Sequence, residues 1–521
     1  MHRAPLTAIE HDTELVESLR RPAAYAHPVD DVDLIETHIS WLLLAGEFAY
    51  KLKKPIVLDF LDFGTLERRR FYCAEEIRLN RRWAPEIYID VVPVTITGGQ
   101  ARFGGDGEIV DYAVRMHRFD QALRLDCQLD AGRLVEEDMK ALAVTIADRH
   151  LKASHVPETN RTRVLELTGQ FMRDNFPPLA GVVDSQLVDK LRTWTERELE
   201  RRASLLAERF DDGFVRDCHG DLHLGNLLRL ADGFRSFDCI EFNEDLRHID
   251  VFCDLAFLVM DLAARRRLDL AAQLLNRYLE ITGDYAGVPL LKLFYAYRCL
   301  VRAKVAVIRG GERDSETDRA ADFAEASFYC ELAGREINER VPRLVVMHGF
   351  SGSGKTFVAS WLMAAMPAIR IRSDIERKRL AGLAEERSSG SAVGGGIYTA
   401  AANERVYARL HALARPILEA GHNVLLDGTY LSSEERRQAV ELAGSVGCRP
   451  VIVDVRAPRE VLRERIVSRG AADVSEARLD VLVSQLETAE PLSVAEQDNV
   501  VAFESHDSPD FNELLARVKQ V

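Results

Sequence analysis

The sequence lacks several features that would assign it to a specialised class. Its eight cysteines include no C-x-x-C pair, so neither a zinc ribbon nor a thioredoxin-like motif is indicated. No apolar targeting segment opens the chain, and the longest strongly apolar run, residues 255–260, is far shorter than the roughly 20 residues of a membrane-spanning helix. The net charge of −15 argues against a dedicated nucleic-acid-binding protein. We therefore expect a cytoplasmic protein with reduced thiols that binds neither nucleic acid nor membranes.

The composition is otherwise that of ordinary globular domains. Hydrophobic residues make up 47% of the chain and aromatic residues 7%, as in typical folded domains. A length of 521 residues is enough for roughly two to four domains. The class of protein therefore has to be read from motifs.

The most specific motif is G-F-S-G-S-G-K-T at residues 349–356, which matches a P-loop at every fixed position. An apolar run with strand character precedes it, and residues of helical composition follow it. In this setting backbone N–H groups and a helix N-terminus surround phosphates, the lysine bridges the β- and γ-phosphates, and the last hydroxyl holds Mg²⁺. The predicted nucleotide-binding residues are Gly349, Ser351, Gly352, Ser353, Gly354, Lys355 and Thr356.

The first third of the chain predicts a small β-rich lobe. Residues 48–53 alternate between polar and apolar and read as a strand, with Lys51 and Lys53 on one face. Thr65 is a plausible N-cap for the charged helix that follows, and strands are predicted over 87–97, 100–103 and 108–117. A strand with lysine, a helix with glutamate and a β-meander resemble, in this order, the N-lobe of a protein kinase.

Residues 219–226 read H-G-D-L-H-L-G-N, and an acid follows at Asp238. Phosphoryl transfer needs a carboxylate that accepts the proton of the attacking hydroxyl, and an amide and a second carboxylate that hold Mg²⁺. The pattern resembles the catalytic core of the aminoglycoside phosphotransferase and choline kinase family. That resemblance implies Asp221 as the base, Asn226 and Asp238 as metal ligands, and structural roles for His219 and Asp254.

The remaining ATP contacts follow from the same resemblance. Lys51 lies two residues after an alanine, as in the A-x-K pattern of kinases, and is the preferred phosphate anchor, with Lys53 as the alternative. Glu76 is the preferred helix partner of that lysine, and Glu75 is the alternative. Met116 would lie in the hinge segment whose backbone meets adenine.

A second set of residues follows the P-loop. Asp374 comes directly after a short strand, and Asp427 ends an apolar strand. This arrangement resembles small-molecule P-loop kinases of the gluconate kinase, shikimate kinase and zeta-toxin type. The resemblance implies that Asp374 deprotonates the acceptor hydroxyl and that Arg377 helps to hold the substrate. It also implies that Asp427 holds the metal through water, and that Arg469 lies in a lid and neutralises charge on the transferring phosphoryl group.

Some of these assignments have alternatives. Asp374 could instead be a helix N-cap, a position that favours aspartate in any protein. Arg463 and Arg465 are two residues apart and cannot both point into one site from a helix. Residues 388–396, rich in glycine and serine, could be a loop over the substrate or a plain linker.

We therefore predict an α+β protein-kinase-like bilobal domain followed by an α/β P-loop domain with a parallel sheet. The expected boundaries are 1–120 for the N-lobe, 121–338 for the helical C-lobe and 339–521 for the P-loop domain. Both domains are expected to bind ATP and Mg²⁺ and to phosphorylate hydroxyls of small polar molecules. The alternative is a regulatory protein in which one domain senses nucleotide or a partner. A true protein kinase is disfavoured because D-F-G and A-P-E segments are absent from the sequence.

Overall fold

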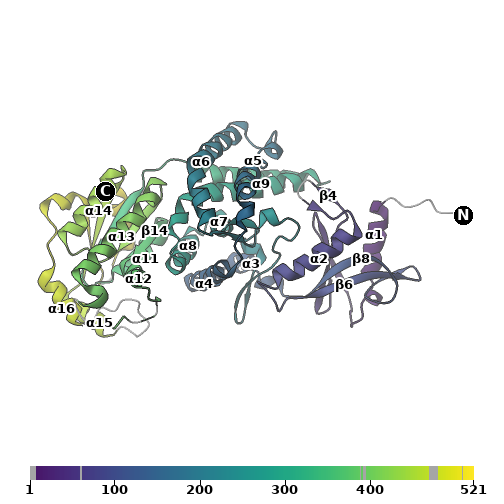
Figure 1. Ribbon diagram of the computed structural model, residues 1–521, viewed down its shortest axis with the longest axis horizontal. Coiled ribbons are helices and arrows are strands. Elements are labelled where there is room, and N and C mark those ends of the chain that lie inside the picture. The colour runs from purple at the N-terminus through teal and green to yellow at the C-terminus, as the bar shows by residue number, and fades with distance from the viewer. Residues whose placement is uncertain are drawn as a thin grey trace. The chain divides into compact units, whose positions relative to one another are not determined.

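A computed structural model describes residues 8–58, 61–385, 387, 389–390, 395–468, 479–506 and 509–521. The chain divides into two compact units (Figure 1). Unit 1 contains residues 1–134, 148–261 and 297–331, and unit 2 contains residues 135–147, 262–296 and 332–521. Each unit has its own sheet and its own candidate site.

The sheet of unit 1 has six strands in the order β1-β2-β3-β8-β6-β7. β3 lies between β2 and β8 and is antiparallel to both. An apolar cluster that includes Leu43, Tyr50, Leu52 and Val94 packs on one side of this sheet. The N-terminal elements are α1 Ala8–Leu19, β1 Val32–Glu36, β2 Ser40–Ala45, β3 Phe48–Lys53, β4 Val57–Leu58, β5 Leu61–Asp62, α2 Leu66–Asn80, β6 Tyr88–Thr97, β7 Gln100–Phe103 and β8 Glu108–His117.

Helix α2 begins where the sequence predicts it. The Thr65 side chain accepts a hydrogen bond from the Arg68 backbone N–H and so caps the first turn. The helix packs against β6 and β8 (Figure 1). This packing turns the glutamate-bearing face of α2 toward the lysines of β3.

The remainder of unit 1 is mainly helical and contains two short antiparallel strand pairs, β10 with β11 and β12 with β9. Four helices, α4, α7, α9 and α10, contribute residues to both units. The elements between residues 125 and 336, of which α8 lies wholly in unit 2, are α3 Leu125–Asp130, α4 Glu136–Lys152, α5 Arg161–Arg173, α6 Ser185–Asp211, β9 Val215–Asp217, β10 Leu227–Leu230, β11 Gly233–Ser236, β12 His248–Asp250, α7 Val251–Ala264, α8 Leu268–Thr282, α9 Leu291–Gly311 and α10 Glu316–Glu336.

The sheet of unit 2 has five parallel strands in the order β14-β15-β13-β16-β17. Buried strand residues such as Val345, Leu425 and Val453 pack against Val358 and Leu362 of α11. The elements are β13 Arg343–His348, α11 Lys355–Ala365, β14 Ala368–Arg372, α12 Ser373–Leu380, α13 Ala400–Glu419, β15 Asn423–Asp427, α14 Ser433–Ser445, β16 Arg449–Arg456, α15 Arg459–Val467, α16 Leu479–Thr488, β17 Val500–Glu504 and α17 Phe511–Gln520. The predicted parallel sheet is confirmed.

Unit 2 also contains residues 262–296, which include all of α8. α8 packs against α11 and β14 of the P-loop sheet. The domain boundaries expected at 120/121 and 338/339 stay predictions, because compact units and sequence domains divide a chain by different criteria.

The structure bears on two features discussed in the sequence analysis, membrane-spanning segments and the state of the cysteines. Among the described helices, none has the length and apolar character needed to cross a membrane. All eight cysteines are described and free of disulfide bonds, and seven of them are buried.

Candidate active sites

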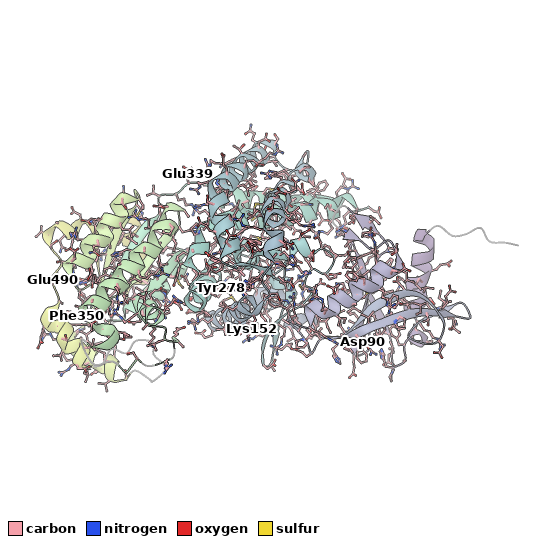
Figure 2. All side chains as sticks on the ribbon, viewed as in Figure 1. Asp90, Lys152, Tyr278, Glu339, Phe350 and Glu490 are labelled. Atoms are coloured by element: carbon pink, nitrogen blue, oxygen red, sulfur yellow. The ribbon has the colours of Figure 1, made fainter. Side chains whose placement is uncertain are left out.

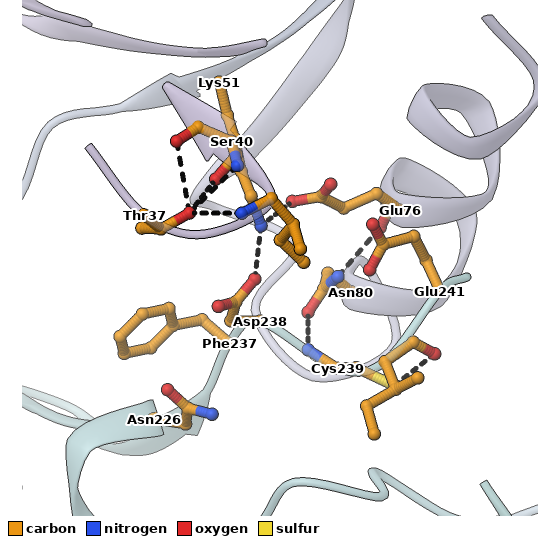
Figure 3. A network of polar contacts seen from close by, with 12 residues as sticks. Thr37, Ser40, Lys51, Glu76, Asn80, Asn226, Phe237, Asp238, Cys239 and Glu241 are labelled. Atoms are coloured by element: carbon orange, nitrogen blue, oxygen red, sulfur yellow. Dashed lines mark hydrogen bonds and ion pairs between the residues drawn. The ribbon is translucent and has the colours of Figure 1, made fainter. Parts of the chain in front are cut away.

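The two lysines of β3 contact a glutamate of α2 in unit 1, and Figure 3 shows Lys51 between Glu76 and Asp238. Lys51 Nζ lies 3.0 Å from Glu76 Oε1 and 2.5 Å from Asp238 Oδ1. Lys53 Nζ lies 2.7 Å from Glu76 Oε2 and also contacts Glu241. Glu76 therefore bridges the two lysines, and Lys51 alone reaches Asp238.

Burial separates the two lysines. The Lys53 side chain is 1% exposed and that of Lys51 is 14% exposed. Burial by itself would raise the pKa of Glu76, but the two ammonium groups hold that pKa well below its usual value. Glu75 instead pairs with Arg78 on the same helix. The structure thus brings Glu76, and not Glu75, to the lysines.

The catalytic-loop residues of the sequence motif lie together. Asn226 Nδ2 donates hydrogen bonds to the Asp221 backbone oxygen at 3.0 Å and to Asp221 Oδ2 at 2.9 Å. The buried Asp254 carboxylate accepts the backbone N–H groups of His219 and Gly220, at 2.9 and 3.1 Å. Asp254 therefore fixes the start of the loop, as the sequence predicts.

His219 is placed as a supporting residue. Its ring Nε2 lies 3.0 Å from the Phe237 carbonyl oxygen, and its Nδ1 accepts the Asp221 backbone N–H at 3.3 Å. Complete burial lowers its pKa, so the ring is neutral at pH 7. A neutral ring with both nitrogens engaged orients the loop and is not free to act as a base.

Asp221 is held in its ionised form. Burial would raise its pKa, but the interaction with His223 and the charge of Arg298 lower that pKa well below the ordinary value. His223 also accepts the Gly225 backbone N–H through Nδ1 at 3.1 Å. His223 thus shapes the loop and stabilises its carboxylate.

Asp238, predicted as a metal ligand, forms an ion pair with Lys51. Its φ of 60° is unusual for a residue other than glycine, and its backbone N–H donates to the Tyr88 hydroxyl at 3.0 Å. Its side chain is 45% exposed and its Oδ1 lies 2.5 Å from Lys51 Nζ. Asn226 donates to Asp221 through its Nδ2, so its Oδ1 is not used in that contact. A carboxylate and an amide oxygen suit Mg²⁺.

Met116 lies near the end of β8, opposite Ala49 of β3. It belongs to an apolar cluster with Leu44 and Leu228, against which Phe237 packs. Apolar side chains are the usual lining of a site for a nucleobase. The predicted contact of Met116 with adenine stays a prediction.

The P-loop of unit 2 has the predicted strand, loop and helix arrangement between β13 and α11; Phe350 marks it in Figure 2. Gly349 and Gly354 have φ values of +135° and +90°, and a Cβ on Gly349 would lie 2.4 Å from the Val455 carbonyl oxygen. Only glycine fits there. Lys355 Nζ donates to the Phe350 carbonyl oxygen at 2.7 Å, and Ser353 Oγ has no hydrogen-bond partner among the described residues.

Two contacts to the P-loop were not predicted from the sequence. Gln485 of α16 accepts the Ser351 backbone N–H at 2.9 Å. Arg465 of α15 donates to the Ser353 carbonyl oxygen at 3.3 Å and to Ser505 Oγ at 3.0 Å, whereas Arg463 is exposed. No sequence pattern predicts the contact of Gln485. For Arg465, the helical spacing shows only that Arg463 and Arg465 cannot both point into one site.

The acids predicted for the second site follow neighbouring strands. β14 and β15 are parallel, and Arg372 pairs in register with Asp427. Asp374 lies in the first turn of α12, and the N-cap position belongs to Arg372. Asp374 is therefore not the cap of this helix. Asp427 is buried, burial raises its pKa, and its Oδ2 has no hydrogen-bond partner in the described part of the chain.

Arg377 is fixed by the segment before α13. Its Nη1 donates to the Ile397 carbonyl oxygen at 2.9 Å and to Asn403 Oδ1 at 2.6 Å, and its guanidinium lies over the Tyr398 ring. Arg469, the predicted lid arginine, lies outside the described residues, as does much of the segment 388–396.

Two domain families match this chain. Residues 107–291 match the phosphotransferase enzyme family, and residues 344–492 match an AAA domain. The first match includes Asp221, Asn226 and Asp238, and the second includes the P-loop, Asp374 and Asp427. The protein is thus a chain with a protein-kinase-like phosphotransferase domain and a P-loop domain of kinase type.

Curated relatives share both halves. The uncharacterized protein Rv2004c of Mycobacterium tuberculosis and the uncharacterized protein Mb2027c of Mycobacterium bovis are each 31% identical over 462 residues, which cover 86% of this chain and 89% of the relative. The chain belongs to the same family as these proteins.

Solved structures each resemble part of the chain. A gluconokinase from Sinorhizobium meliloti is 22% identical and covers 34% of this chain and 91% of its own, with a TM-score of 0.25. A choline kinase from Cryptosporidium parvum is 12% identical, and the match covers 59% of this chain and 89% of the kinase, with a TM-score of 0.36. The amicoumacin kinase hAmiN is 11% identical, and the match covers 63% of this chain and 94% of the kinase, with a TM-score of 0.39.

Proposed function

We propose that this protein is a bifunctional, ATP-dependent phosphotransferase of the cytoplasm. Each domain binds ATP with Mg²⁺ and phosphorylates a hydroxyl of a small polar molecule, such as a sugar or an amino sugar. The observation that supports this most is that Lys51 contacts both Glu76 and Asp238 beside the Asp221–Asn226 pair. These are the groups that anchor phosphates, hold metal and accept a proton in phosphoryl transfer.

In the phosphotransferase domain, Lys51 binds the ATP phosphates and Glu76 holds the lysine in place. Asp238 and Asn226 hold Mg²⁺, which neutralises charge on the phosphates when it is bound. Asp221 accepts the proton of the acceptor hydroxyl, and its depressed pKa keeps it ionised for that role. Its hydrogen bond from Asn226 fixes the direction of the carboxylate.

In the P-loop domain, the loop N–H groups and Lys355 hold the phosphates of a second ATP. Thr356 and Asp427 hold its Mg²⁺, and the unsatisfied Asp427 Oδ2 is the oxygen available to a water of the metal shell. Asp374 accepts the proton of the acceptor hydroxyl. Arg377 orients the acceptor, and Arg469 neutralises charge on the transferring phosphoryl group.

A regulatory role is the second candidate, because Gln485 occupies the Ser351 N–H of the P-loop. Under that reading the P-loop domain binds nucleotide without turnover and signals its presence. Steady-state ATP consumption with and without a panel of sugars, amino sugars and aminoglycosides separates the two. A rate of ATP consumption that increases when an acceptor is added supports catalysis. A rate that no acceptor changes supports a sensing role.

Calorimetry tests whether there are two nucleotide sites. Titration with ATP and Mg²⁺ should give two binding events, of which Lys355→Ala removes one and Lys51→Ala weakens the other. A single event that Lys355→Ala abolishes would refute the proposal for the phosphotransferase domain. Glu331→Gln, in α10 and outside both sites, is a matched control that should bind as the wild type does.

A further inference from the structure

The strand that leads to Asp374 is held from outside its own sheet by α8. Asn276 of α8 is 1% exposed. Its Nδ2 donates to the Ala368 carbonyl oxygen at 2.9 Å, and its Oδ1 accepts the Arg370 backbone N–H at 2.6 Å. α8 lies within the segment that matches the phosphotransferase family, yet it belongs to the same compact unit as the P-loop. Tyr278 of this helix is labelled in Figure 2.

The same helix places a buried carboxylate beside the arginines of β14. Glu280 is 4% exposed, and its Oε1 lies 2.7 Å from Arg370 Nη2. Arg370 also donates to Ser360 Oγ of α11 at 2.6 Å. Burial would raise the pKa of Glu280, but Arg370, Arg372 and Arg277 together lower it. Glu280 is therefore a fixed negative charge at the end of β14.

Arg372 lies between this charge and the acid of the nucleotide site. Its Nη1 is 3.8 Å from Glu280 Oε1, and its Nε is 3.9 Å from Asp427 Oδ2. Both distances exceed that of a hydrogen bond. The guanidinium is thus shared between two carboxylates and is tightly paired with neither.

We propose that Glu280 is a positioning residue for the P-loop site, because it restrains Arg372 and keeps Asp427 available to the metal shell. Without the Glu280 charge, the guanidinium is drawn onto Asp427, and a bidentate pair there occupies the carboxylate oxygens. The P-loop site is then incomplete without a helix from the phosphotransferase segment. This inference rests on the proposed role of Asp427 in holding Mg²⁺.

The test measures Mg²⁺-dependent ATP binding by calorimetry in the full chain. The measurements use a Lys51→Met background, in which ATP binding at the phosphotransferase site is weakened, so that the titration reports on the P-loop site. Glu280→Gln should raise the Mg²⁺ concentration needed for half-maximal binding by about tenfold, the low end of the effect of changing a residue that orients a metal ligand. In an Arg372→Gln background the same change should have no effect, because the arginine that it releases is gone.

Three further variants separate positioning from folding. Glu385→Gln removes a partner of Arg277, 2.8 Å away, and should leave the Mg²⁺ requirement unchanged. Asn276→Ala should lower the melting temperature without changing that requirement. Glu280→Asp keeps the charge and should give a smaller shift than Glu280→Gln, and it serves as the reporter if Glu280→Gln does not fold.

Two results would overturn the inference. One is a wild-type Mg²⁺ requirement in Glu280→Gln, and the other is a shift that persists in the Arg372→Gln background. If Lys355→Ala leaves ATP binding intact, the proposed function of the P-loop domain fails instead, whatever Glu280 does. The two failures are therefore distinguishable.

Discussion

Replacement of Lys53 by methionine distinguishes the two lysines of β3. Methionine keeps much of the volume of the lysine stem and removes the charge. In Lys53→Met, Glu241 loses its contact with Lys53, while Glu76 keeps Lys51 at 3.0 Å. We expect this variant to be unstable but still able to bind ATP, because Lys51 and its contact with Asp238 remain.

The size of the loss follows from burial. The Lys53 side chain is 1% exposed and that of Glu241 is 4% exposed. Removal of one partner of a buried ion pair costs about 3–5 kcal/mol, because the other charge is left uncompensated. Burial already raises the pKa of Glu241, so protonation will offset part of this cost at low pH. At roughly 2–4 °C per kcal/mol for a unit of this size, the melting temperature should fall by on the order of 10 °C.

Lys51→Met is the matched control. Its partner Asp238 is 45% exposed and can be solvated, and Glu76 keeps Lys53. We expect a loss of about 1 kcal/mol, typical of a pair open to solvent, together with weaker ATP binding in the phosphotransferase domain. Thermal melts and calorimetry on both variants give the comparison. The reasoning is refuted if Lys53→Met abolishes ATP binding with little loss of stability, since Lys53 would then be the anchor.

Three other predictions concern single side chains. Asp221→Asn should leave ATP binding nearly intact and slow phosphoryl transfer by ~10²–10⁴-fold, as expected for loss of a general base; a wild-type single-turnover rate would contradict this. Burial raises the pKa of Glu435, in the first turn of α14, from 4.5 to about 7, so its ionisation as the pH rises through this range costs stability. Glu435→Gln should therefore stabilise the protein by at most about 3 kcal/mol near pH 8 and have no effect near pH 4; denaturant melts that show an equal effect at both pH values would exclude this. Gln485→Ala frees the Ser351 N–H, and ATP should bind the P-loop about fivefold more tightly, the equivalent of one neutral hydrogen bond of about 1 kcal/mol; weaker binding in calorimetry would instead make Gln485 a nucleotide contact.

Much of the architecture could be predicted because its signals are local. The strand before Gly349, the N-cap at Thr65 and the catalytic loop at 219–226 each depend on residues close in sequence. Turn, cap and loop chemistry act over a few residues, so these elements needed no knowledge of the fold. The expected α+β and α/β fold classes are confirmed.

The contacts that remained open are distant in sequence. Glu280 meets Arg370 across 90 residues, and Gln485 meets Ser351 across 134. Lys51 and Lys53 share one face of a strand, so the two-residue period could not rank them. Their different burial comes from α2 and from Glu241, which only the folded chain brings to β3.

The amide of Asn276 has a consequence for how this chain can be divided. β14 is the outermost strand of its sheet, and an uncovered outer strand is a template on which another chain can add a strand of its own. Asn276 occupies two of its outward groups, the Ala368 carbonyl and the Arg370 N–H. A fragment that begins at residue 339 keeps the whole P-loop motif but loses this cover, so we expect it to self-associate through β14. A separate peptide of residues 262–296 should compete with that association and return the fragment to a monomer.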